Sequence, residues 1–91
     1  MKTLHLNLHR KWFDMILSGE KKEEYRAITP YWHKRLYKKG YDTITFSNGY
    51  AKDRPQFIIE LIDIQENEGR EEWGAITGVT YYVLRLGRIL K

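Results

Sequence analysis

Gly19-Glu20-Lys21-Lys22-Glu23-Glu24-Tyr25-Arg26 decides how the chain is organised, because a helix stop stands directly before residues that can form a strand. Gly19 predicts the end of a helix, since glycine readily adopts the left-handed conformation found there. On a strand with a rise of ~3.4 Å per residue, Glu24 and Arg26 share one face, about 6.8 Å apart at their α-carbons. Lys21 has the opposite parity and joins them only from a turn that precedes the strand. The stretch therefore predicts either a lysine–glutamate–arginine group or a solvated strand edge with ordinary ion pairs.

The residues before this stretch predict a strand followed by a helix. Residues 3–9 alternate with leucines on one face, which is typical of a strand with one buried side. Residues 10–18 carry Phe13, Ile16 and Leu17 at helical spacing. Residues 21–28 are then predicted as a second strand, with Tyr25 as its β-favouring residue.

The rest of the chain predicts one more helix and three more strands. Thr29 followed by Pro30 is typical of a helix start, and this helix is expected to run to about Lys39. Strands are expected at 42–47, 57–64 and 80–90, with loops at 48–55 and 66–78 and a possible bulge at Gly87. Five short strands and two short helices predict an α+β, mainly β fold: a small β-barrel capped by helices.

Composition bounds the class of protein. With 91 residues, of which 42% are hydrophobic and 31% charged, residues 1–91 are expected to form a single globular domain. The absence of cysteine excludes disulfides, thiolate metal sites and a cysteine nucleophile. No apolar run approaches the ~20 residues of a membrane span, and polar residues interrupt the N-terminal segment. We therefore expect a cytoplasmic protein without a membrane partner.

Positive charge is concentrated in one part of the chain. Residues 1–54 carry 12 Lys and Arg residues but 6 Asp and Glu residues, whereas residues 55–91 carry 4 and 6. Any surface that attracts anions is therefore expected to come mostly from residues 1–54.

The three histidines do not predict a metal site. His5 and His9 share a strand face but lie about 13–14 Å apart at that separation, and His33 has no partner at ligand spacing. The sequence also holds no glycine-rich phosphate loop or nucleophile elbow. We expect no metal and no cofactor.

Two further segments carry cations next to aromatic residues. In the second predicted helix, one side carries the basic residues Lys34, Arg35, Lys38 and Lys39. This side is either a stripe for phosphates or the solvated face of an amphipathic helix that docks Trp32 and Leu36. The loop at 48–55 holds Tyr50 between basic residues and is either a clamp over a nucleotide or a plain connection; its cations are Lys52 and Arg54.

The motif resembles a known family. Gly19-x-Lys21-x-x-Glu24-x-Arg26 matches all four fixed positions of the G-x-K-x-x-E-x-R signature of ASCH domains, a branch of the PUA-like β-barrels. Residues 12–18 also look like the family's helix before the motif, and the resemblance extends over most of the chain. It implies a small PUA-like β-barrel whose motif residues point into a cleft that binds RNA or other nucleic acid.

The resemblance also implies possible enzyme activities. Some ASCH proteins are amidohydrolases that deacetylate N4-acetylcytidine, and others are ribonucleases. In the amidohydrolase branch a threonine nucleophile stands at the position of Glu24, and a lysine matches Lys21. This chain has the carboxylate of Glu24 in place of that nucleophile. Glu24 could instead act as a general base on a water molecule, or accept a hydrogen bond from a cytosine amino group. Glu71 or Glu72 could stand near the cleft.

We therefore expect a nucleic-acid-binding domain for RNA or a modified nucleotide, with a cationic cleft made by Lys21, Glu24 and Arg26. The expected contacts to the nucleic-acid backbone are Lys34, Arg35, Lys38, Lys39, Lys52 and Arg54, and Tyr50 is a further expected nucleic-acid-binding residue. The alternative is a hydrolase acting on a nucleoside or RNA, in which Lys21 and Glu24 would be catalytic. A third alternative is a protein-interaction module whose motif only holds the helix against the strand.

Overall fold

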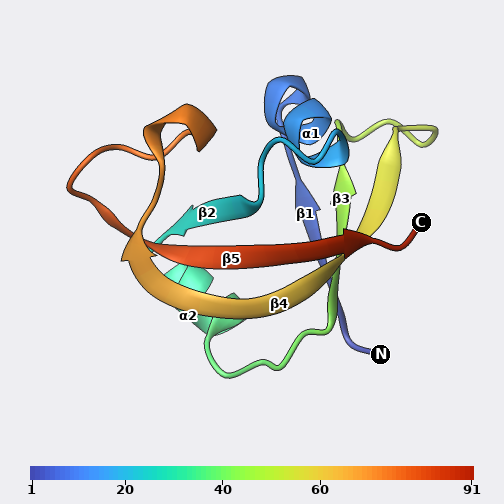
Figure 1. The fold of residues 1–91 in the computed structure, drawn as a ribbon. Helices are drawn as coiled ribbons and strands as arrows, with labels where there is room; N and C mark the ends of the chain where they lie inside the picture. The colour runs from blue at the N-terminus through green and yellow to red at the C-terminus, as the bar shows by residue number, and fades with distance from the viewer.

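One strongly curled sheet organises the fold (Figure 1). The computed structural model describes residues 1–91. Its five strands are ordered β1-β3-β4-β5-β2, with β1 parallel to β3 and all other neighbours antiparallel. The strands are β1 (Thr3–Asn7), β2 (Glu23–Ala27), β3 (Thr43–Ser47), β4 (Gln56–Glu68) and β5 (Thr80–Ile89). The helices are α1 (Arg10–Leu17), α2 (Pro30–Leu36) and the single 3-10 turn η1 (Glu71–Trp73).

The sheet curls into a half-barrel, so the predicted α+β, mainly β fold is confirmed. β4 and β5 are the longest strands and sweep across the molecule in Figure 1. The two edge strands are β1 and β2, and each pairs on one side only. A seam therefore remains between them, and the side chains that cross it belong to the candidate site. No helix has the length and apolar character needed to span a membrane.

The core fills the inside of the curl. The alternating leucines of β1 point inward as predicted, and Phe13 of α1 meets Phe57 of β4 with ring centroids 4.9 Å apart. Burial of apolar area at about 25 cal/mol per Å² is the main term that stabilises such a fold. Fourteen buried residues form this cluster: Leu4, Leu6, Leu8, Phe13, Ile16, Leu36, Ile44, Phe46, Phe57, Ile59, Leu61, Tyr82, Leu84 and Leu86.

The second helix is shorter than predicted. α2 ends at Leu36, because Tyr37 is extended (ψ 121°) and Lys38 adopts a positive φ of 53°. The prediction that Lys38 and Lys39 continue a cationic helix face is therefore wrong, since both residues lie beyond the helix. The N-terminal part of that prediction is confirmed: Thr29 accepts a hydrogen bond from the backbone N–H of Trp32, and Pro30 opens the first turn.

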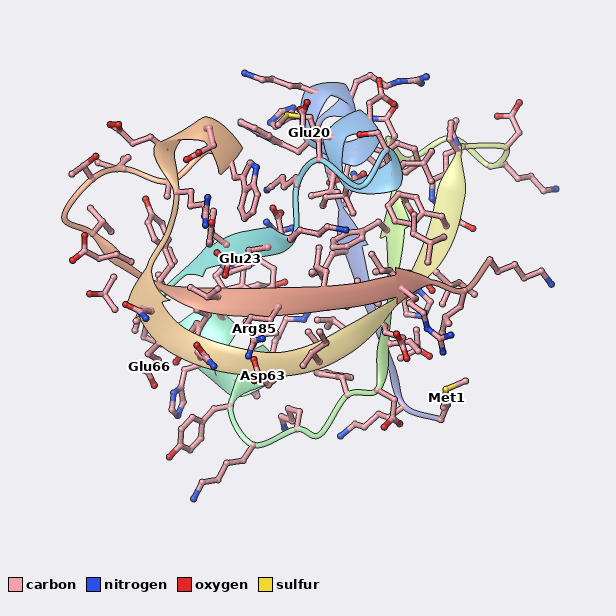
Figure 2. The ribbon with its side chains drawn as sticks, viewed as in Figure 1. Met1, Glu20, Glu23, Asp63, Glu66 and Arg85 are labelled. Atoms are coloured by element: carbon pink, nitrogen blue, oxygen red, sulfur yellow. The ribbon has the colours of Figure 1, made fainter.

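The fourth strand is longer than predicted. β4 continues to Glu68 because its polar end pairs with β5, from Asp63 opposite Arg85 to Glu68 opposite Thr80. Arg85 and Asp63 also form an ion pair of 2.9 Å on the face of the sheet shown in Figure 2. The register shifts beside Gly87, which confirms the predicted bulge.

Candidate functional site

The motif places three charged side chains in contact, and we call Lys21, Glu24 and Arg26 the triad. The Nζ of Lys21 donates to the Oε1 of Glu24 at 2.6 Å, and Arg26 Nη1 donates to the other oxygen, Oε2. Lys21 lies in the turn after α1, where its backbone N–H donates to the carbonyl of Met15, and β2 begins only at Glu23. The convergence expected of the motif, with Lys21 placed ahead of the strand, is therefore confirmed.

The triad is buried, so the alternative of a solvated strand edge is wrong. The side chains of Lys21, Glu24 and Arg26 are 1%, 5% and 17% exposed. Two cations share one carboxylate, which leaves the group with an excess of one positive charge. Breaking a buried pair of this kind leaves an unpaired charge away from water, which is strongly unfavourable. The triad therefore stabilises the fold only while it stays complete.

Aromatic rings surround the cations of the triad. Lys21 Nζ lies 4.9 Å from the ring centroid of Trp12 and 5.4 Å from that of Tyr25. The guanidinium of Arg26 lies 5.2 Å from the ring centroid of Trp32. Such cation–π contacts strengthen when they are removed from water. They hold the cations in place without using their hydrogen-bond donors.

The triad lines a hollow of about 200 Å³, which we call the triad hollow. The hollow lies between the end of β1, the start of α1, strand β2 and the η1 turn. Charged groups and aromatic rings face the same space, which is the mixture found in sites for small polar ligands. Its lining residues are Asn7, Leu8, His9, Trp12, Lys21, Glu24, Tyr25, Arg26, Trp73, Gly74 and Tyr81.

The loop that carries Trp73 is held against the sheet by two tyrosine hydroxyls. The OH of Tyr25 accepts a hydrogen bond from the backbone N–H of Arg70, and the OH of Tyr81 accepts one from that of Ile76. Gly74 lies so close to Trp12 that a Cβ would stand 2.9 Å from Cζ2 of its ring. Trp73 is therefore positioned beside the triad by contacts distant in sequence. Glu71 and Glu72 are exposed and do not line the hollow.

Two arginines donate hydrogen bonds to carbonyls of β1, Arg26 from β2 across the seam and Arg35 from α2. Arg26 Nη2 donates to the carbonyl of Asn7, and Arg35 Nη2 donates to the carbonyl of His5, both at 3.3 Å. The two guanidiniums each lie 5.2 Å from the ring centroid of Trp32. Of the cations predicted on the second helix, only Arg35 is connected to the triad in this way.

The other predicted contact residues do not line the triad hollow. Lys38 and Lys39 line a separate hollow of about 460 Å³ with Tyr41 and Ile64, which shares no residue with the triad hollow. Lys34 and Lys52 are exposed, and Arg54 donates to the carbonyl of Ala51 within its own loop. Tyr50 is 89% exposed. The structure therefore brings the three motif residues together in one hollow, whereas Lys38 and Lys39 line another.

Burial lowers the pKa of Lys21 below its ordinary value of 10.5, and the neighbouring carboxylate of Glu24 opposes the shift. The unfolded chain then binds more protons than the folded one in the window below 10.5, so the free energy of unfolding rises with pH there. We expect urea denaturation to show this rise as the pH approaches 10.5 from below. The Lys21→Met variant should lack the rise, whereas Lys22→Met, at an exposed neighbour, should keep it.

Tyr25 sets the highest pH at which that experiment can be interpreted. Burial raises the pKa of its hydroxyl above 10.0, so at higher pH the unfolded chain loses this proton first and stability falls. Below about pH 10 the loss of stability caused by Tyr25 therefore does not mask the rise caused by Lys21. Equal pH dependence in the wild type and in Lys21→Met would contradict the assigned pKa direction of Lys21.

The site offers hydrogen-bond donors, one carboxylate and flat aromatic faces. No group of three or more His, Asp or Glu side chains is close enough to hold a metal ion. The aromatic residues that line the site were not predicted from the motif.

Comparison with known proteins found no matching protein-family model, no matching curated protein and no matching solved structure.

Proposed function

We propose that the chain is a nucleic-acid-binding domain of the ASCH type, whose triad hollow takes one unpaired or modified base of RNA. The observation that carries this proposal is the buried triad in an aromatic-lined hollow. At about 200 Å³ the hollow is smaller than the ~300–1,000 Å³ typical of drug-sized ligands, so it suits a single flat group.

The chemistry of the lining suits the edge and the faces of a base. Lys21 has three N–H donors and Arg26 has five, and their contacts with Glu24 leave donors for carbonyl and ring-nitrogen acceptors. Each oxygen of Glu24 has a second lone pair that can accept from an exocyclic amino group such as that of cytosine. Trp12 and Trp73 offer aromatic faces of the kind on which unstacked RNA bases are recognised.

Two further observations support the proposal. The G-x-K-x-x-E-x-R spacing of residues 19–26 resembles the ASCH signature, and its lysine, glutamate and arginine are the residues that meet in the hollow. The excess of positive charge lies in residues 1–54, which contribute most of the lining. Recognition of single-stranded RNA commonly combines such cations with aromatic stacking.

Titration with cytidine 5′-monophosphate and with a labelled single-stranded hexacytidylate RNA tests the proposal. We expect both to bind saturably, and the RNA affinity to fall as salt rises. Arg26→Gln should weaken both ligands by about 10-fold or more, because a charge-assisted hydrogen bond contributes about 1.5–3 kcal/mol. Lys34→Gln removes the same charge from the exposed surface of α2 and should leave mononucleotide binding unchanged. Absence of binding at millimolar mononucleotide and micromolar RNA would contradict the proposal.

Hydrolysis of a modified nucleoside is the second candidate function. The lowered pKa of Lys21 favours it, since a lysine that loses its proton more easily can serve as a base. Both oxygens of Glu24 are engaged by cations, which disfavours this carboxylate as the base. Incubation with N4-acetylcytidine decides the question: release of acetate that is lost in Lys21→Met would favour the enzyme, and no release would favour binding alone.

A further inference from the structure

A second hollow adjoins the triad hollow and shares a wall with it. Asn7, Leu8 and His9 line both hollows, and the second continues past Arg10 to Tyr50. We call this space, about 320 Å³ in volume, the Tyr50 hollow. The two hollows share the residues at the end of β1 and therefore lie next to each other; we call the pair the groove, with the triad at one end and Tyr50 at the other.

Hydrogen bonds fix the wall between the two hollows. The Oδ1 of Asn7 accepts from the backbone N–H groups of Leu8 and Gly49, at 3.0 and 2.9 Å. The Nδ2 of Asn48 donates to the carbonyl of Leu8 at 3.0 Å. These bonds fasten the start of the loop after β3 to the end of β1. The base of the loop that carries Tyr50 is thereby set relative to the triad.

The ring of Tyr50 is free to receive a stacking partner. It is 89% exposed, and no other aromatic ring or cation packs on it. Cations accompany the two hollows: Lys21 and Arg26 line the triad hollow, Arg10, which also pairs with Asp14 at 3.1 Å, lines the Tyr50 hollow, and Lys52 lies in the loop of Tyr50. A positively charged groove with successive aromatic platforms is how proteins bind single-stranded nucleic acid.

We propose that the groove binds two successive nucleotides of a single strand, with one base in the triad hollow and its neighbour stacked on Tyr50. The phosphate between them would pass Arg10. This inference rests on the proposed function and adds the substrate class: an unpaired strand of at least two nucleotides. A base held in a duplex stays stacked between its neighbours, so duplex RNA is excluded from the triad hollow.

Binding of cytidine 5′-monophosphate and hexacytidylate RNA by the Tyr50 variants tests the inference. Removing a stacking platform costs about 1–3 kcal/mol per base, so Tyr50→Ala should weaken the RNA about 5- to 150-fold. The mononucleotide, which occupies only the triad hollow, should bind within about 2-fold of wild type. Tyr50→Phe keeps the ring and should retain RNA binding. Tyr37→Ala removes an exposed tyrosine that lines the separate hollow near Lys38 and should have no effect.

The outcomes separate this inference from the proposed function. Unchanged RNA affinity in Tyr50→Ala, with intact mononucleotide binding, would overturn the two-nucleotide groove and leave the triad hollow as the binding site. Loss of RNA affinity in Tyr50→Ala, with no effect of Arg26→Gln on either ligand, would overturn the triad hollow instead. Equal affinity for the hexacytidylate and for a duplex of that strand with its complement would overturn the single-strand assignment. Absence of any RNA binding would overturn both proposals.

Discussion

Replacing Glu24 with alanine is expected to lower the free energy of unfolding by about 3–5 kcal/mol, the typical cost of removing one partner from a buried ion pair. The variant would leave the ammonium of Lys21, whose side chain is 1% exposed, without its carboxylate, and Arg26 would lose the same partner. Domains typically have about 5–15 kcal/mol in total, so this variant should lie close to unfolding at room temperature. Urea denaturation followed by tryptophan fluorescence measures the loss.

Two variants calibrate this result. Glu20→Ala removes an exposed carboxylate that lies beside α1 in Figure 2, and should change stability by no more than about 0.5 kcal/mol. Glu24→Gln keeps the shape of the side chain and one acceptor oxygen. Its loss of stability should therefore be larger than that of Glu20→Ala and smaller than that of Glu24→Ala. If Glu24→Ala were as stable as Glu20→Ala, the three charges would not be held together in solution.

The double variant Lys21→Met with Glu24→Leu is expected to separate folding from binding. Well-packed apolar residues that replace a buried ion pair are often neutral or stabilising, so the variant should regain most of the stability lost in Glu24→Ala. Arg26 would still be held by the carbonyls of Asn7 and Tyr25 and by the ring of Trp32. Binding of the mononucleotide should nevertheless fall about 100-fold or more, since two hydrogen bonds to charged groups, about 1.5–3 kcal/mol each, are removed.

Both properties are measured on the same preparation, by urea denaturation and by titration with cytidine 5′-monophosphate. A stable double variant that binds like the wild type would place the nucleotide elsewhere. A stable double variant without binding would also reject the interpretation that the motif only holds the helix against the strand. The single variant Lys22→Met, at the exposed neighbouring position, is the matched control for both measurements.

The fold was predictable where burial follows a local pattern. Leu4 and Leu6 alternate along β1, with Leu8 continuing the pattern directly after it, and the apolar residues of α1 recur at helical spacing, so one buried face explains each element. The end of β4 was not predictable in this way, because its last residues are polar on both faces. They form a strand only because β5 lies alongside them, which is a long-range contact.

The charged residues of the site were predictable from the sequence, and the aromatic residues that line it were not. The spacing of Lys21, Glu24 and Arg26 is local, so a turn followed by a strand is enough to bring them together. Trp12 and Trp73 come from a helix and a distant loop, and they line the same hollow because Gly74 permits close approach to Trp12 and tyrosine hydroxyls anchor the loop. Lys38 and Lys39 were misplaced because the end of α2 depends on a positive φ at a lysine, which has no sequence signal.

The most direct test of the triad hollow as a nucleotide site is a two-dimensional ¹H–¹⁵N NMR titration of the wild-type chain with cytidine 5′-monophosphate. We expect saturable shifts of the backbone amides of residues 21–26 and of the indole N–H signals of Trp12 and Trp73. The amides of residues 38–41, beside the separate hollow, should not move. Absence of saturable shifts at millimolar nucleotide, or shifts confined to residues 38–41, would contradict the account.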